Sequence, residues 1–108
     1  MRKITQAATE AFDNSYNFKS GNTKVIATDN EVKLYLFNNV IATKCRKTHT
    51  VKISSCGYTT ATTRERLNGL LTRYGANFGR VYIRDFTFYY ENSEGTITTL
   101  GDFYTVIM

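Results

Sequence analysis

The side chains that most often build catalytic and metal centres are scarce in this chain. Among its 108 residues are one histidine, His49, and two cysteines, Cys45 and Cys56. His49 has no acidic or cysteine partner at a useful spacing, so a solvated histidine is a better interpretation than a ligand or base. No glycine-rich phosphate loop, paired-carboxylate pattern or nucleophile elbow is visible. The sequence therefore predicts a protein that acts by binding, without catalysis, metal or cofactor.

Positive charge is the chemistry that the chain does carry, and it is unevenly placed. The formal net charge is +5. Residues 44–84 hold nine bases against one acid, Glu65, whereas residues 85–108 hold four acids and no base. This distribution favours contact with a polyanion or an acidic protein through one face, and a solvated basic surface explains the charge alone equally well.

Basic and aromatic residues alternate along residues 79–90, which are predicted to form one long strand. Strict alternation would place six of them on one face, namely Arg80, Tyr82, Arg84, Phe86, Phe88 and Tyr90. Such surfaces bind single-stranded nucleic acid by neutralising phosphates and stacking bases. The alternative is that Phe86 and Phe88 belong to the core, as aromatic strands in small domains usually do. The opposite face would hold Val81, Ile83 and Tyr89, and Asp85 is interpreted as an exposed bulge residue.

A helix is predicted from the Thr62–Glu65 capping-box spacing to Tyr74, with Gly75 at its end. Its buried stripe would consist of Leu67, Leu70, Leu71 and Tyr74. On a helical wheel Arg66 and Arg73 share one flank of this stripe and Arg64 lies on the other. Gly69 would leave the outer face open to close approach.

The start of this helix is a second candidate site. Free amides there, followed by arginines, could hold a phosphate. The hydroxyls before and at the start of the helix belong to Tyr58, Thr59, Thr60, Thr62 and Thr63. Helix capping is the simpler explanation of the threonines. Across both candidate sites, the phosphate-binding residues would be Arg64, Arg66, Arg73, Arg80 and Arg84, with Tyr82 or Phe86 stacking on bases.

Other elements must position these residues. A first helix is predicted at residues 4–12, ending near 13–17, with Thr5, Gln6, Thr9 and Glu10 facing away from its apolar stripe. A loop at 19–22 follows. Strands are then predicted at residues 24–28, 31–37, 40–46 and 49–55, and one or two more at 96–100 and 103–108, after a turn at 92–95.

A turn at Asn38-Asn39 sets the predicted register. It places Phe37 opposite Val40, Leu36 opposite Ile41 and Leu34 opposite Thr43. Both faces of the sheet then look substantially apolar, so a helix is expected on each. In the same register Cys45 faces Thr50 and not Cys56, which argues against a disulfide.

The predicted fold class is α+β, with residues 1–108 forming a single domain. A mainly antiparallel sheet, made of the four-strand meander and C-terminal strands, would be covered by two amphipathic helices. No apolar stretch approaches the roughly 20 residues that a membrane span requires. Residues 1–12 lack the apolar run of a signal peptide, so we expect reduced cysteines and residence in a cytoplasm.

The stretch from Cys56 to Asn68, with its Gly-aromatic pair, threonine run and Thr-Thr-Arg-Glu-Arg-Leu-Asn ending, resembles a family of small uncharacterised proteins of tailed bacteriophages. The resemblance covers about residues 22–71 and includes the hairpin 34–42. This chain departs from the pattern at Phe37 and Asn38, where His-Gly is usual. The resemblance implies a phage accessory gene acting in the host cytoplasm, and it carries no activity or functional residues.

Three functional hypotheses remain open. The first is a phage accessory protein that binds nucleic acid through its basic centre. The second is an inhibitor that docks on an acidic host or defence protein. The third is a minor virion or assembly component that self-associates through strand edges.

Overall fold

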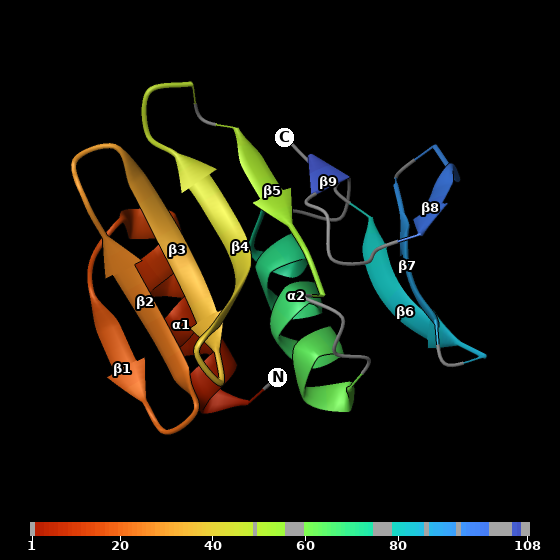
Figure 1. The fold of residues 1–108 in the computed structure, drawn as a ribbon, viewed down its shortest axis with the longest axis horizontal. Coiled ribbons are helices and arrows are strands. Elements are labelled where there is room, and N and C mark those ends of the chain that lie inside the picture. Colours follow the sequence, from red (N-terminus) through yellow and green to blue (C-terminus); the bar gives the residue numbers. More distant parts are fainter. Residues whose placement is uncertain are drawn as a thin grey trace.

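The computed structural model describes residues 2–48, 50–55, 60–74, 79–85, 87–92, 94–99 and 105–106. Within these residues the chain forms two helices and nine strands (Figure 1). The helices are α1 (Lys3–Asn14) and α2 (Ala61–Tyr74). The strands are β1 (Phe18–Ser20), β2 (Thr23–Ala27), β3 (Glu31–Leu36), β4 (Asn39–Cys45), β5 (Val51–Ile53), β6 (Arg80–Arg84), β7 (Thr87–Glu91), β8 (Ile97–Thr99) and β9 (Thr105–Val106). The predicted α+β class is confirmed.

The described strands form two antiparallel sheets. The large sheet has the order β1-β2-β3-β4-β5-β9, and the small sheet has the order β6-β7-β8. The predicted meander corresponds to β2 through β5. Part of the predicted loop at 19–22 is instead strand β1, because Lys19 and Ser20 pair with β2 and only Gly21 and Asn22 form the turn. At the other edge, β9 returns to pair with β5.

The turn between β3 and β4 lies one residue earlier than predicted. Phe37 and Asn38 occupy it with φ of 51° and 66°, the left-handed values that a type I′ hairpin turn requires. Tyr35 therefore lies opposite Val40, and a register shift follows between Tyr35 and Leu34. The predicted pairs Phe37–Val40, Leu36–Ile41 and Leu34–Thr43 are thus wrong. The structure instead pairs Leu36 with Asn39 and Leu34 with Ala42.

Both helices cover the same face of the large sheet (Figure 1). Helix α1 packs on β1, β2 and β3, and α2 packs on β4 and on α1. The core of this face is built by cross-strand neighbours that are all fully buried, including Val25, Leu34, Ala42 and Ile53. The expectation of a helix on each face is wrong, because the register shift brings Ile41 and Ala42 together on the covered face. Neither of the two described helices lies over the other face.

Helix α1 buries Ala8, Ala11 and Phe12, as its apolar stripe predicts. It also buries Thr5 and Thr9, which were expected to face away. The Thr9 hydroxyl donates to the backbone carbonyl of Thr5 at 2.8 Å, so its burial leaves no unpaired hydroxyl proton. This rotation of the stripe brings Thr5 to the contact between α1 and α2.

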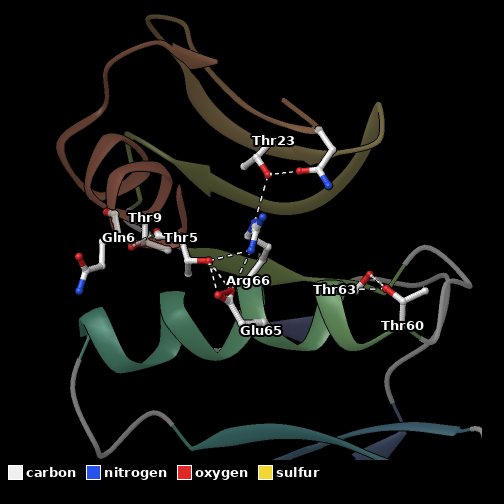
Figure 2. A network of polar contacts seen from close by, with 9 residues as sticks. Thr5, Gln6, Thr9, Thr23, Thr60, Thr63, Glu65 and Arg66 are labelled. Atoms are coloured by element: carbon white, nitrogen blue, oxygen red, sulfur yellow. Dashed lines mark hydrogen bonds and ion pairs between the residues drawn. The ribbon is translucent and has the colours of Figure 1, made fainter. Parts of the chain in front are cut away.

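The small sheet packs against α2, which lies between the two sheets in both views (Figures 1 and 2). The side chain of Asn68 on α2 connects the helix to the small sheet through two hydrogen bonds with the backbone of Val81. The amide Nδ2 donates to the Val81 carbonyl at 2.9 Å, and the Val81 amide donates to Asn68 Oδ1 at 2.8 Å. The face of the small sheet that carries buried Val81, Phe88 and Tyr90 therefore points toward α2.

Candidate nucleic-acid interface

Arg66 was predicted to contact phosphate, but it lies inside the protein. Its side chain is 2% exposed. Nε donates to Thr23 Oγ1 at 3.1 Å, and Nη1 donates to Thr5 Oγ1 at 2.8 Å and to Glu65 Oε2 at 2.9 Å (Figure 2). Helix α1, helix α2 and strand β2 each supply one partner or more. A buried guanidinium needs such partners, so Arg66 holds these elements together and does not reach a ligand.

Glu65 balances the charge of Arg66. Its carboxylate also accepts a hydrogen bond from Thr5 Oγ1 at 2.7 Å. Burial by itself raises the pKa of the Glu65 carboxyl, but the hydrogen bonds from Thr5 and Arg66, together with the Arg66 charge, outweigh burial and lower that pKa below its ordinary value. Glu65 is therefore ionised near neutral pH and belongs to the same network.

The five arginines predicted to share one patch are not all at the surface, because Arg66 is buried. Arg73 pairs with Asp13 at 3.1 Å, and Arg80 pairs with Glu91 at 2.9 Å. Arg64 on α2 and Arg84 at the end of β6 are exposed, on elements that belong to different layers. The arginine patch expected from the sequence therefore cannot include Arg66, and two of its other members already face a carboxylate.

The predicted strand at 79–90 is a hairpin. The chain reverses at Asp85, whose φ is 51°, and β7 returns beside β6. Asp85 is thus a turn residue and not a bulge. Because of this reversal Phe88 lies opposite Ile83 and Tyr90 lies opposite Val81, so both rings are buried toward α2.

The face of this hairpin that points away from α2 does combine arginines with tyrosines. Tyr89 lies on this face beside Tyr82, whereas the sequence predicted it on the opposite face. Tyr82 stacks on Tyr89 with ring centroids 5.5 Å apart, and the Arg80 guanidinium lies 5.0 Å from the Tyr82 ring centroid. Phe86 lies outside the described residues. The Tyr82 ring is therefore already in contact with one ring and one cation of its own sheet.

The N-terminus of α2 is capped by its own chain. Thr60, and not Thr62, is the cap residue: its hydroxyl accepts from the Thr63 amide at 3.1 Å (Figure 2). Glu65 is correspondingly not part of a capping box and turns to Thr5 and Arg66. Gly69 is buried and so does not open the outer face. Tyr58 and Thr59 of the proposed phosphate site lie outside the described residues.

Lys44 is partly buried, so its charge is not fully available at the surface. It lies on the covered face, where Nζ donates to the Asp13 carbonyl at 2.7 Å and lies 5.6 Å from the Phe12 ring centroid. Burial lowers the pKa of the Lys44 ammonium group, and the neighbouring Asp13 charge partly opposes this.

The open face of the large sheet is the feature that gathers positive charge. The register places Lys19, Lys24, Tyr35 and Val40 in one cross-strand row. It places Ile26, Lys33, Thr43 and Lys52 in the next. Among the described strand residues of this face the one acid is Glu31, which pairs with Lys33 at 3.2 Å. We call the set Lys19, Lys24, Lys33 and Lys52 the lysine face.

A groove of about 390 Å³ lies at one end of the lysine face. Its lining residues are Lys19, Gly21, Asn22, Lys24, Tyr35, Phe37 and Asn38. The β1–β2 and β3–β4 turns meet here, since the Phe37 amide donates to the Asn22 carbonyl at 2.9 Å. Lys24 Nζ lies 4.6 Å from the Tyr35 ring centroid, and Phe37 is 64% exposed. Cations and aromatic rings thus share one concave site.

Two further properties concern the described part of the chain only. It contains no group of three histidine, cysteine or acidic side chains placed to hold a metal ion. None of its helices has both the length and the apolar character needed to cross a membrane.

Cys45 is a free thiol. Its backbone amide donates to the Thr50 carbonyl at 2.8 Å, and Cys56 lies outside the described residues.

Comparison with known proteins gives a match over nearly the whole chain. Residues 1–106 match the family model described as Kyanoviridae Gp96 protein. The chain belongs to the Kyanoviridae Gp96 family. It is thus a phage protein, as the resemblance implied. No curated protein and no solved structure matches it.

In this Gp96-family protein the lysine face was missed by reasoning from the sequence. The period-two alternation of β2, β3 and β5 already places Lys24, Lys33 and Lys52 opposite the apolar side chains. Only the assumption that both faces were covered concealed this pattern. Phe37 could not be found in the same way, because its exposure depends on where the turn falls.

Proposed function

We propose that this Gp96-family protein binds nucleic acid through the lysine face, without catalysis, in the cytoplasm of the infected host. The observation that carries the proposal is a sheet face that neither described helix covers, on which the described strand residues include four lysines and one glutamate. Lysine side chains on such a surface can neutralise phosphates along a polyanion and release its counterions. The binding residues proposed here therefore replace the arginines expected from the sequence.

The groove beside Phe37 favours nucleic acid over an acidic protein as the partner. An acidic protein surface would be attracted by the same lysines, but it would not require an exposed aromatic ring among them. Nucleic acids offer both phosphate charge and flat bases, and cationic grooves lined with aromatic rings suit this combination. The groove combines Lys19 and Lys24 with Tyr35 and Phe37.

Binding of a labelled oligonucleotide at low salt, followed by fluorescence anisotropy, tests the proposal. We expect the double variant Lys24→Gln/Lys52→Gln to bind several-fold more weakly than the wild type. The matched control is Arg64→Gln/Arg84→Gln, which removes the same charge from exposed positions outside the lysine face. It should retain nearly wild-type affinity.

Two outcomes would overturn the proposal. One is the absence of binding to DNA and RNA at low salt. The other is an equal loss in the lysine and arginine variants, since charge alone would then account for the affinity. Circular dichroism and thermal melting of each variant check that the fold is retained.

A further inference from the structure

The groove at the end of the lysine face is large enough for a small ligand and is lined by cationic, amide and aromatic side chains. Its volume of about 390 Å³ falls at the small end of the range of ligand pockets, roughly 300–1,000 Å³. The two turns that form it are held together by the hydrogen bond from the Phe37 amide to the Asn22 carbonyl. The amide side chains of Asn22 and Asn38 line the groove, and such groups can hydrogen-bond the edges of bases.

Phe37 is placed in this groove at a cost to the turn. Its φ of 51° is one that bulky residues rarely adopt, and type I′ turns prefer Asn, Asp or Gly at this position. The side chain is also 64% exposed, the largest exposure among the large hydrophobic residues of the described chain. Turn geometry does not account for a phenylalanine here, and most of its surface lies outside the core. Stacking against a flat ligand would remove its ring from water.

Tyr35, the second aromatic residue of the groove, already has a cation beside its ring. Lys24 Nζ lies 4.6 Å from the centroid of the Tyr35 ring, so a cation occupies the neighbourhood of that ring. Lys19 lies directly opposite Lys24 in the register of β1 and β2. The groove therefore offers one exposed ring, Phe37, with two ammonium groups among its neighbours.

We infer that this groove binds an unpaired nucleotide, with its base stacked on Phe37 and its phosphate held by Lys19 and Lys24. The inference rests on the proposed function and makes it more specific, because it names single-stranded nucleic acid as the preferred ligand. In a duplex the bases are paired and stacked on one another, so none is available to Phe37. Only a single strand or an unpaired end can place a base in the groove.

The variant Phe37→Asn tests the inference without damaging the turn. Asparagine tolerates the left-handed conformation better than phenylalanine, so this change removes the ring and should leave the melting temperature equal or higher. Binding to a single strand should weaken by about 5- to 150-fold, the range that corresponds to one base–aromatic stack. Binding to the duplex of the same sequence should not change. The control is Ile97→Ala, which removes an exposed apolar side chain from β8 of the small sheet.

A second readout does not depend on affinity. A single strand that carries 5-iodouracil should, on irradiation in the complex, crosslink to the peptide that contains Phe37. Equal affinity for single strand and duplex, unchanged by Phe37→Asn, would refute the inference while leaving the proposed function intact. Crosslinks confined to the β6–β8 sheet would refute it as well. Failure to bind either ligand would overturn the proposed function itself.

Discussion

Arg66 donates a hydrogen bond from Nε to the hydroxyl of Thr23 at 3.1 Å, which ties the buried face of helix α2 to the first residue of strand β2. Thr23 in turn donates to Asn22 Oδ1 at 2.8 Å. Asn22 lines the groove and accepts the hydrogen bond from the Phe37 amide. The arginine expected to touch a ligand thus supports the groove from inside as a positioning residue.

Replacing Arg66 tests how much of the fold depends on this network. In Arg66→Met the hydroxyls of Thr5 and Thr23 and the carboxylate of Glu65 lose their shared donor. Removing one partner of a buried charge network costs about 3–5 kcal/mol, and we expect a loss of that size in the free energy of unfolding. Urea denaturation followed by circular dichroism measures it. Arg64→Gln, a change at an exposed position two residues away on the same helix, should stay within about 0.5 kcal/mol of the wild type.

The same network predicts a dependence of stability on pH. The pKa of Glu65 is lower in the folded protein than its ordinary value of 4.5. Its contribution to stability is therefore fully present above about pH 4.5, and it is lost as the pH falls through the lower folded-state pKa. Urea midpoints measured from neutral pH downward should fall less steeply in Glu65→Gln than in the wild type. Parallel curves for the two proteins would contradict this role of Glu65.

The β3–β4 turn predicts opposite effects of two substitutions at Asn38, whose φ is 66°. Asn38→Gly should leave stability within about 0.5 kcal/mol or raise it, because glycine adopts this conformation without steric cost. Asn38→Val should lower stability by about 1–2 kcal/mol. Thermal melting distinguishes them, with Thr98→Val on exposed strand β8 as the control for introducing valine. If Asn38→Val were neutral, the assigned turn would be wrong.

The position of the helix cap can be checked by a pair of alanine substitutions. Thr60→Ala removes the hydroxyl that accepts from the Thr63 amide, and it should cost about 1 kcal/mol. Thr62→Ala removes the cap expected from the sequence and should change stability by less than about 0.5 kcal/mol. Urea denaturation gives the free energy of unfolding of each variant. A larger loss in Thr62→Ala than in Thr60→Ala would contradict the cap at Thr60 and support the capping box that the sequence predicts at Thr62.

Local patterns in the sequence were sufficient to predict the positions of several helices and strands. The apolar spacing of Leu67, Leu70 and Leu71 correctly predicts the buried side of α2, and all three are buried. Alternation of apolar and polar residues correctly predicts β2 to β5 to within a few residues at each end. These elements form where the sequence expects them because each buries a face that its own periodicity defines.

The turns and the site could not be predicted in the same way. Each reversal puts a non-glycine residue into a left-handed conformation. Phe37 is a residue that such turns rarely use, and Asp85, although it tolerates this conformation, stands within a run of strand-forming aromatic and β-branched residues. The burial of Arg66 depends on Thr23 and Thr5, which lie 43 and 61 positions away in the sequence. Helical periodicity places Arg66 on a flank of α2, but only the packing of α1 and β2 around that flank shows that it is inside.

The dependence of nucleic-acid affinity on salt tests the role of the lysine face most directly. If its four lysines neutralise phosphates of a single strand, the logarithm of the binding constant should fall with the logarithm of salt concentration with a slope of about −2.8. This slope corresponds to a roughly 50-fold loss between about 50 and 200 mM salt. For Lys24→Gln/Lys52→Gln the slope should be about −1.4, a roughly sevenfold loss over the same interval, whereas Arg64→Gln/Arg84→Gln should keep the wild-type slope. A wild-type slope that persists in the lysine variant and drops in the arginine variant would contradict the account.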